Sequence, residues 1–323
     1  MSRRCAFKGC FAPELSCSNG EFKLEDCPHW TSGAESVIAG EEQDNAAAVS
    51  GEFRFPWTGN AMGAADLNYL AGAATTRLLT MAGAADAGKT SLLAAFYLLL
   101  ARGLSPEGIA FSGSLTLEGW ENIASNLRWS SQHGPSFPPH TSSGAGRRPG
   151  LLHLSLRTPT KLHELLAADA PGEWFSEWAT NKQAPQADGA RWLADCSDVI
   201  LVIADSQALA SPQRGLARKS LVDLLRRVGG ELRGRPVALV WTKCDIAVPA
   251  DIVTTIHEAA NRSLIDYTEF RVSMHPAENG ESQNQGRGIL ELLHWVLTAP
   301  SKGYELQTVE APEWALLRTF GKF

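Results

Sequence analysis

The feature that most constrains the fold is a glycine-bounded loop between two apolar segments. Residues 83–90 read Gly-Ala-Ala-Asp-Ala-Gly-Lys-Thr and fit the pattern G-x-x-x-x-G-K-[ST] without a gap. The apolar run 77–82 before the loop predicts a buried strand, and the apolar stretch 91–102 after it predicts a helix. In that order, backbone N–H groups and the positive end of the helix surround an anion. The sequence therefore predicts a phosphate-binding loop in an α/β fold.

Two side chains of this loop have distinct expected roles. Lys89 would bring its ammonium to the terminal phosphates of a nucleoside triphosphate, and the hydroxyl of Thr90 would ligate Mg²⁺. The residues that we expect to contact the nucleotide here are Gly83, Asp86, Ala87, Gly88, Lys89, Thr90 and Ser91. The alternative interpretation is a glycine-rich helix cap with an exposed lysine, and the flanking strand and helix argue against it.

The remainder of the chain alternates short apolar runs with helical patterns. Apolar runs occupy 151–156, 165–168, 199–204, 237–241 and 270–273, and helical patterns occupy 64–74, 175–193, 212–228, 250–263 and 288–297. Strands that alternate with longer helices predict a mostly parallel sheet covered by helices on both faces. We therefore expect a three-layer α/β sandwich with six strands.

Composition changes along the chain suggest four parts. These are a cysteine-rich segment at 1–30, a linker at 31–60, the main α/β domain at 61–300 and a C-terminal tail at 301–323. The linker is rich in Ala, Gly, Ser and Glu and shows little periodicity, as expected of a connecting segment.

A second motif follows the apolar run 165–168. Asp169-Ala-Pro-Gly172 fits D-x-x-G, in which the carboxylate can hold a water on Mg²⁺ and the glycine amide can meet a γ-phosphate. The motif alone is weak, because an Asp followed by a Pro-Gly turn often has no such function. Its place at the end of a predicted strand is where open α/β sheets bind ligands.

A third motif indicates which base is bound. The apolar run 237–241 leads directly into Thr242-Lys243-Cys-Asp245, and a further predicted strand leads to Ser273. A carboxylate at 245 can accept hydrogen bonds from the N1–H and 2-amino groups of guanine, a donor pair that adenine lacks. Lys243 would lie along the base, and the backbone N–H near Ser273 could meet the guanine carbonyl. The ligand predicted from these elements is GTP or GDP.

In their order and spacing these elements resemble those of TRAFAC-class, Ras-like P-loop GTPases, over about residues 75–300. More narrowly, the phrases FPWTGNAMG, FSGSLTLEGWE and LLHLSL, behind a cysteine-rich start that ends CPHW, are similar to bacterial double-GTPase-type proteins of conflict systems. The resemblance implies a GTPase that hydrolyses GTP to GDP and phosphate. It also implies a nucleotide-controlled switch with effector or activator proteins, acting in bacterial defence.

Four positions depart from the Ras-like pattern. Thr242 replaces the commoner Asn of the guanine motif, and Ala85 replaces a Gly beside the γ-phosphate. Glu173 stands where the family has a water-orienting Gln, so it is our candidate for contact with the attacking water, and hydrolysis is expected to be slow. Asp86 stands where an Asn helps to hold K⁺ in some relatives, which raises the prospect of a monovalent-cation effect.

The segment 130–150 is the most loop-like part of the chain and is the expected switch loop. Thr141 is the candidate hydroxyl for Mg²⁺ and the γ-phosphate, with Ser142 or Ser143 as substitutes. Arg147 and Arg148 could stabilise charge on the transferred phosphoryl group. The alternatives are a loop with an incidental threonine and solvated loop charges.

The start of the chain carries a candidate zinc site. Of the six cysteines, Cys5, Cys10, Cys17 and Cys27 lie close together in sequence, and His29 could substitute for one of them. Zn²⁺ takes four such ligands in a closed structural site. The spacing differs from the tight C-x₂-C knuckle, so reduced cysteines without a metal remain the alternative.

Composition excludes several classes. A net charge of −6 and a pI near 5.8 argue against a protein that coats nucleic acid through bulk charge. The longest apolar stretch, 92–101, is about half of the roughly 20 residues that span a bilayer. No apolar run of a secretory signal follows the start, so a cytoplasmic protein is expected. A homo-oligomer is left open.

Three rival interpretations stay open at this stage. They are a GTP-dependent scaffold that hydrolyses poorly, a P-loop ATPase in which the T-K-C-D match is accidental, and a zinc-containing nucleic-acid binder with a vestigial nucleotide site. The tryptophans at 174, 178 and 192 fit core packing better than an effector surface.

Overall fold

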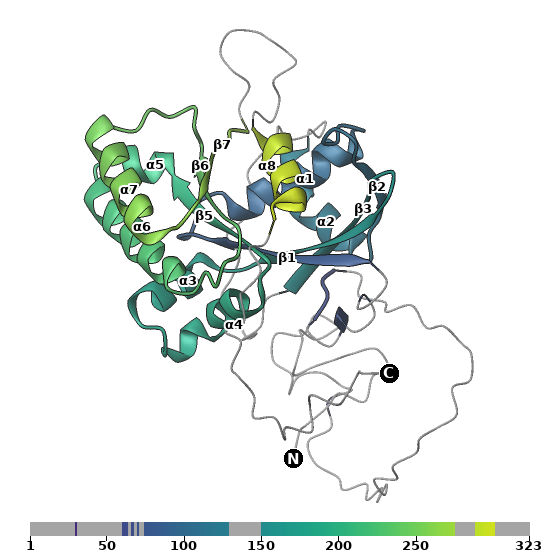
Figure 1. Ribbon diagram of the computed structural model, residues 1–323, viewed down its shortest axis with the longest axis horizontal. Coiled ribbons are helices and arrows are strands. Elements are labelled where there is room, and N and C mark those ends of the chain that lie inside the picture. Colours follow the sequence, from purple (N-terminus) through teal and green to yellow (C-terminus); the bar gives the residue numbers. More distant parts are fainter. Residues whose placement is uncertain are drawn as a thin grey trace, which may run out of the picture. The chain divides into compact units, whose positions relative to one another are not determined.

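The structure is a computed structural model (Figure 1). It describes residues 30, 60–63, 66–67, 70, 74–128, 150–274 and 288–300. Apart from Trp30, all of these belong to one unit, Phe55–Phe323. Among the described residues, no helix is long and apolar enough to cross a bilayer.

The elements follow one another along the chain in a largely alternating order. They are β1 (Thr75–Ala82), α1 (Lys89–Ala101), β2 (Ala110–Gly113), α2 (Leu117–Ala124), the 3₁₀ helix η3 (Ser125–Leu127), β3 (Gly150–Arg157), β4 (Leu162–Asp169), α3 (Gly172–Thr180), the 3₁₀ helix η4 (Pro185–Ala187), α4 (Asp188–Cys196), β5 (Val199–Asp205), α5 (Ser206–Ala210), α6 (Arg214–Gly229), β6 (Val237–Thr242), α7 (Ala250–Ser263), β7 (Thr268–Arg271) and α8 (Ile289–Thr298).

These strands form one seven-stranded sheet in the order β2-β3-β4-β1-β5-β6-β7. The five strands from β4 to β7 in this order are parallel, whereas β3 pairs antiparallel with β4 and β2 pairs antiparallel with β3. The predicted α/β sandwich with a mostly parallel sheet is confirmed. The predicted number of six strands is wrong, because β2 has only four residues, three of them exposed, and therefore carries no apolar run.

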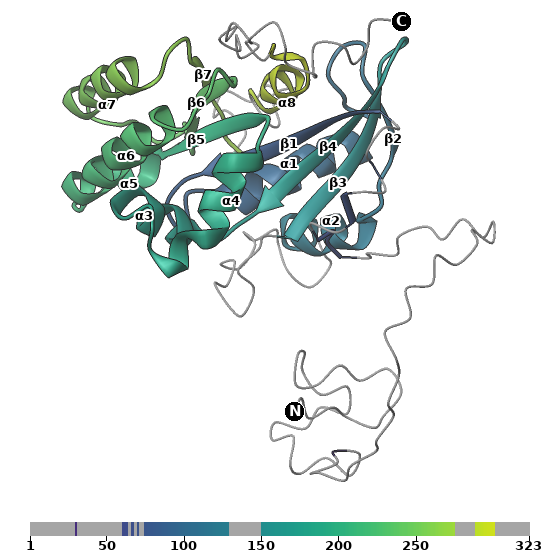
Figure 2. The same cartoon turned by 60° about the horizontal axis from the view of Figure 1, so that its bottom comes forward.

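Helices cover both faces of the sheet (Figures 1 and 2). Along β5, Ile200, Val202 and Ala204 belong to one buried cluster. Val199, Leu201 and Ile203 belong to the other. This period of two is what a strand buried on both faces requires. The first cluster packs against α3 to α7 and the second against α1, α2 and α8.

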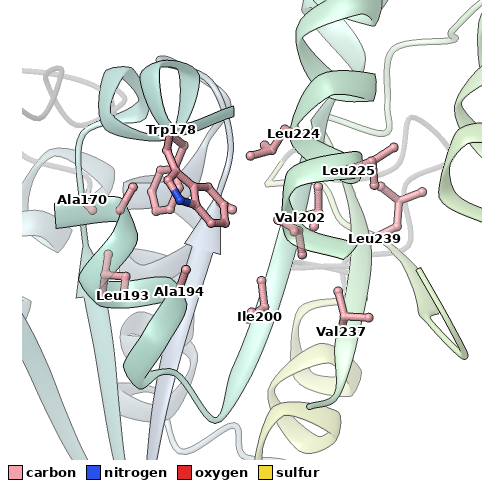
Figure 3. Packing of buried hydrophobic residues seen from close by; sticks show 14 of the residues in the cluster. Ala170, Trp178, Leu193, Ala194, Ile200, Val202, Leu224, Leu225, Val237 and Leu239 are labelled. Carbon is pink, nitrogen blue, oxygen red and sulfur yellow. The ribbon is translucent and has the colours of Figure 1, made fainter. Parts of the chain in front are cut away.

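The α3–α7 face contains the tryptophans that follow the D-x-x-G motif. Trp178 is 1% exposed and lies among aliphatic side chains of α4, α6 and the central strands (Figure 3). Trp174 is also buried, and Trp192 packs partly buried against the same cluster. The expected core role of these side chains is confirmed, and it ties the segment after Gly172 to the body of the domain.

The single helix predicted over 175–193 is wrong, because the structure has two helices there. α3 ends at Thr180, η4 intervenes, and α4 begins at Asp188. Pro185 explains the break, since proline lacks an N–H and disfavours helical geometry at the preceding residue. The Asn181 carboxamide oxygen accepts a hydrogen bond from the Gln183 N–H (3.0 Å) and so satisfies a backbone group in the turn.

Residues 60–63 form a strap across the edge of β3. The N–H of Met62 donates to the Leu151 carbonyl (2.8 Å), and the N–H of Leu151 donates back to Met62 (3.0 Å). Met62 is fully buried. A Cβ at Gly119 would lie 1.7 Å from the Asn60 carbonyl oxygen, so the strap fits only because α2 has a glycine there.

Candidate functional site

The predicted motifs meet at one edge of the sheet. Because β1, β4, β5 and β6 are parallel, their carboxyl ends lie together, and each motif begins where one of these strands ends. This is the edge at which open α/β sheets bind ligands. Loop 83–88 follows β1, Asp169 ends β4, and Thr242 ends β6.

The loop after β1 has the tight backbone that phosphate binding needs. Gly88 has a φ of 84° and caps α1, and Asp86 has a φ of 56°. At the start of the loop, a Cβ on Gly83 would lie 2.8 Å from the Cβ of Ile203 on β5. Glycine is therefore required at 83 for close approach to the sheet and at 88 for its left-handed conformation.

Lys89 begins α1 and turns its side chain back over the loop. Its Nζ donates hydrogen bonds to the carbonyl oxygens of Gly83 (3.2 Å) and Ala84 (2.6 Å), and the residue is 7% exposed. Burial lowers the pKa of Lys89 from 10.5 to about 8, although the negative charges of Asp169 and Glu173 oppose this shift. The ammonium is thus held in a largely buried position beside the loop.

The expected magnesium ligands lie together. The Thr90 hydroxyl donates to Oδ1 of Asp169 at 2.9 Å, which joins the start of α1 to the end of β4. Among the described residues, no three His, Cys, Asp or Glu side chains cluster as a metal site. Mg²⁺ at a nucleotide needs only one or two protein oxygens besides phosphate and water, so this pair fits it.

The glycine of the D-x-x-G motif presses against the phosphate loop. A Cβ on Gly172 would lie 2.1 Å from the Ala85 nitrogen and 2.3 Å from the Ala84 carbonyl carbon. Any larger residue at this position would displace one of the two segments. Glu173 follows in the first turn of α3, and its charge acts on Lys89. The position expected to contact the attacking water is therefore close to the lysine.

At the other end of the site, hydroxyl groups hold the T-K-C-D segment. Buried Thr242 donates from Oγ1 to the Ala87 carbonyl oxygen in the phosphate loop (2.8 Å). Ser273 donates from Oγ to Oδ1 of Asp245 (2.6 Å), and the Cys244 N–H donates to the Val272 carbonyl (3.2 Å). These contacts fix the carboxylate of Asp245 relative to both the phosphate loop and the segment after β7.

Sequence reasoning missed two residues of this site, Asp205 and Gln207. The Lys243 Nζ lies 2.9 Å from Oδ2 of Asp205 and 3.0 Å from Oε1 of Gln207, and it also donates to the Asp86 carbonyl (2.9 Å). Asp205 could have been found, because it directly follows the apolar run 199–204 and so lies at the carboxyl end of a strand expected to be parallel.

Several predicted residues lie outside the part of the chain that the structure describes. They are Thr141 with its substitutes Ser142 and Ser143, Arg147, Arg148, the predicted zinc ligands Cys5, Cys10, Cys17 and Cys27, and His29. Ala87 and Ser91 lie where the sequence placed them, at the end of the phosphate loop and in the first turn of α1.

Comparison with known proteins identifies the family of the chain. No match was found among curated proteins. The model of one family, Double-GTPase 2, matches residues 77–296, which is more than half of the chain. The matched range contains the phosphate loop, the D-x-x-G segment, the T-K-C-D segment and Ser273. The resemblance expected from these motifs is confirmed, and the chain belongs to the Double-GTPase 2 family of GTP-binding GTPases.

Proposed function

We propose that the protein binds GTP with Mg²⁺, hydrolyses it slowly to GDP and phosphate, and acts as a nucleotide-controlled switch for partner proteins. The observation that carries the proposal is the pair of hydrogen bonds that hold the base-reading segment in place. Thr242 is bonded to the phosphate loop, and Asp245 is held by Ser273. A carboxylate fixed in this way can select the two adjacent donors of guanine.

The chemistry would be mainly positioning and electrostatic stabilisation. Water attacks the γ-phosphorus, and the bond from that phosphorus to the β–γ bridging oxygen breaks. Lys89 stabilises charge on the β- and γ-phosphate oxygens, and the Gly172 amide meets the γ-phosphate. Thr90 and Asp169 would hold Mg²⁺, which neutralises phosphate charge when bound. Glu173 can accept a hydrogen bond from the water, but its own charge repels the phosphate.

Nucleotide competition tests the choice of base. We expect GTP and GDP, but not ATP, to compete for the site of the full chain with Mg²⁺ present. Asp245→Asn should lose GTP affinity about 100-fold, because hydrogen bonds to a charged acceptor contribute about 1.5–3 kcal/mol each. It should gain binding of xanthosine triphosphate, whose 2-oxo group accepts a bond from the new amide. Asp251→Asn, on the exposed first turn of α7, is the matched control.

A second candidate is a GTP-dependent scaffold that does not turn over. Glu173 favours it, because a carboxylate near Lys89 would lie close to the γ-phosphate. Single-turnover hydrolysis separates the two candidates. Phosphate release above the buffer rate supports the GTPase, whereas tight GTP binding without release supports the scaffold.

The proposal extends to features outside the described residues. Thr141 would complete the magnesium site from the switch loop, and Cys5, Cys10, Cys17 and Cys27 would bind one structural Zn²⁺. Metal analysis of the purified chain tests the zinc site, with serine variants of the cysteines as controls. A cytoplasmic location, effector or activator partners and a role in bacterial defence are the biological part of the proposal.

A further inference from the structure

We propose that Asp205 is a positioning residue for guanine-nucleotide binding, which acts by holding Lys243 across the phosphate loop. The proposal rests on the proposed function, because it concerns the same site. It assigns a role to a residue that belongs to none of the three sequence motifs. The role is to hold the ammonium of Lys243, in the base-reading segment, at the place where it also donates a hydrogen bond to the Asp86 carbonyl of the phosphate loop.

The two carboxylate oxygens of Asp205 have separate partners. Oδ1 accepts hydrogen bonds from the backbone N–H groups of Gln207 (2.9 Å) and Ala208 (3.3 Å), which caps the short helix α5. Oδ2 lies 2.9 Å from the Nζ of Lys243. The side chain of Asp205 is only 11% exposed, so water screens this ion pair less than it screens a surface pair.

Lys243 is held both at its backbone and at its ammonium group. Its backbone has a φ of 52°, an uncommon conformation for a residue with a side chain. Its ammonium has three protons, and three acceptors surround it: Asp205, Gln207 and the carbonyl of Asp86. The methylene stem between these fixed ends is the part that we expect to lie along the base.

Asp205 is the only charged member of that acceptor set. The Asp86 carbonyl and the Gln207 amide oxygen are neutral, so they hold the ammonium less strongly than the carboxylate does. Without the carboxylate, the ammonium would be drawn towards solvent, and the stem would leave its course over the phosphate loop. Nucleotide binding would then have to restore this arrangement, which lowers affinity.

Two other roles for Asp205 must be separated from this one. The first is helix capping alone. Asp205→Asn keeps the cap, because Asn caps helices about as well as Asp, so a loss of affinity in this variant cannot come from capping. The second is a direct charge effect on Lys89, whose pKa Asp205 also raises. Lys243→Met addresses the second role, because it removes the ammonium but leaves the distance between Asp205 and Lys89 unchanged.

The experiment is a double-mutant cycle on the full chain with Mg²⁺, with GDP binding measured by calorimetry. We expect Asp205→Asn to weaken GDP binding about tenfold, in line with loss of a hydrogen bond between charged groups. In the Lys243→Met background the same substitution should change affinity less than twofold. Asp188→Asn, which removes the ion pair of Asp188 with Arg191 on α4, should leave binding unchanged.

Two results would overturn the proposal. One is an unchanged affinity in Asp205→Asn, and the other is an equal loss in both backgrounds. If thermal unfolding shows that Asp205→Asn is not folded, Asp205→Ser repeats the cycle with another good capping residue. A wild-type chain that binds neither GDP nor GTP would instead contradict the proposed function itself.

Discussion

The two ends of the site are held in different ways. At the base end, Thr242 and Ser273 are buried side chains that donate to fixed acceptors, and both contacts can persist when a nucleotide binds. At the phosphate end, Lys89 donates to carbonyl groups of its own loop, and Thr90 donates to Asp169. Under the proposed function, the same Lys89, Thr90 and Asp169 atoms would bind phosphate and Mg²⁺.

If the proposed function holds, the proposed base end is already arranged for binding, whereas the side chains of the proposed phosphate end must exchange hydrogen-bond partners. Preorganised contacts add affinity because nothing has to be reordered on binding. Where a side chain must give up a protein partner for the nucleotide, affinity depends on the charge and protonation state of that side chain. The departures from the Ras-like pattern at Ala85 and Glu173 also belong to the phosphate end. Substitutions at the two ends should therefore affect nucleotide affinity and its pH dependence differently.

The largest effect is expected from Lys89→Met at the phosphate end. It removes the ammonium that donates to the Gly83 and Ala84 carbonyl groups of the loop, and we expect GDP and GTP affinity to fall at least about 100-fold. Calorimetry with each nucleotide measures this loss. Lys219→Met, which removes an exposed lysine paired with Asp223 on α6, is the matched control. Near-normal binding by Lys89→Met would contradict the assignment of the phosphate end.

The pH dependence of binding tests the same end without changing its shape. With a pKa of about 8, Lys89 is charged in the free protein below pH 8 and neutral above it. Phosphate favours the charged form, so binding above pH 8 must take up a proton. We expect GDP affinity to be nearly constant below pH 8 and to fall about tenfold per pH unit above it.

Lys89→Arg controls for this interpretation, because a guanidinium does not titrate in that range. Any titration of the nucleotide is common to both proteins. The variant should therefore bind without the slope assigned to Lys89, even if its affinity is lower. Equal slopes in the two proteins would show that another group is responsible.

At the base end we expect a smaller effect that is uniform across pH. Thr242→Val keeps the shape of the side chain but leaves the Ala87 carbonyl without its hydroxyl donor. The free energy of unfolding should fall by about 1–3 kcal/mol, the cost of an unsatisfied buried group, and GDP affinity should fall several-fold. Chemical denaturation and calorimetry measure the two quantities. Thr242→Ser, which retains the hydroxyl, should largely preserve both.

The smallest expected effect is an increase in the rate of GTP hydrolysis. Glu173→Gln removes a like charge near the γ-phosphate, worth about 1 kcal/mol at 4 Å in a water-like environment, so hydrolysis should rise roughly fivefold. Single-turnover phosphate release measures the change. Glu177→Gln, one turn further along α3 and exposed, should leave the rate unaltered. A slower Glu173→Gln enzyme would show that the carboxylate assists the attacking water.

The sequence could predict those parts of the molecule that depend on residues close together in the chain. The phosphate loop, Asp169 and Asp245 each follow an apolar strand, so their meeting at one sheet edge follows from parallel pairing. The buried strands β5 and β6 were recognisable because nearly every residue in them is apolar.

The parts that it missed depend on contacts between distant residues. β2 is stabilised by pairing with β3 and carries no apolar signal of its own. Asp205 is a single carboxylate, and only the folded structure brings it within 2.9 Å of Lys243. The strap depends on Gly119, which lies far from it in sequence, and no local pattern could reveal that pairing.

The strap has a consequence for how the domain is bounded. The family match begins at residue 77, yet Met62 lies buried fifteen residues earlier, beside Leu151 on β3. The neighbouring residue of β3, Gly150, pairs with Asp169 in the sheet register. A protein shortened to the matched range would lose Met62 and its two backbone hydrogen bonds to Leu151, one residue along β3 from the partner of Asp169, the carboxylate that we propose holds Mg²⁺. The folded domain therefore begins before the matched range, with residues 60–63 held on the strand whose next residue pairs with Asp169.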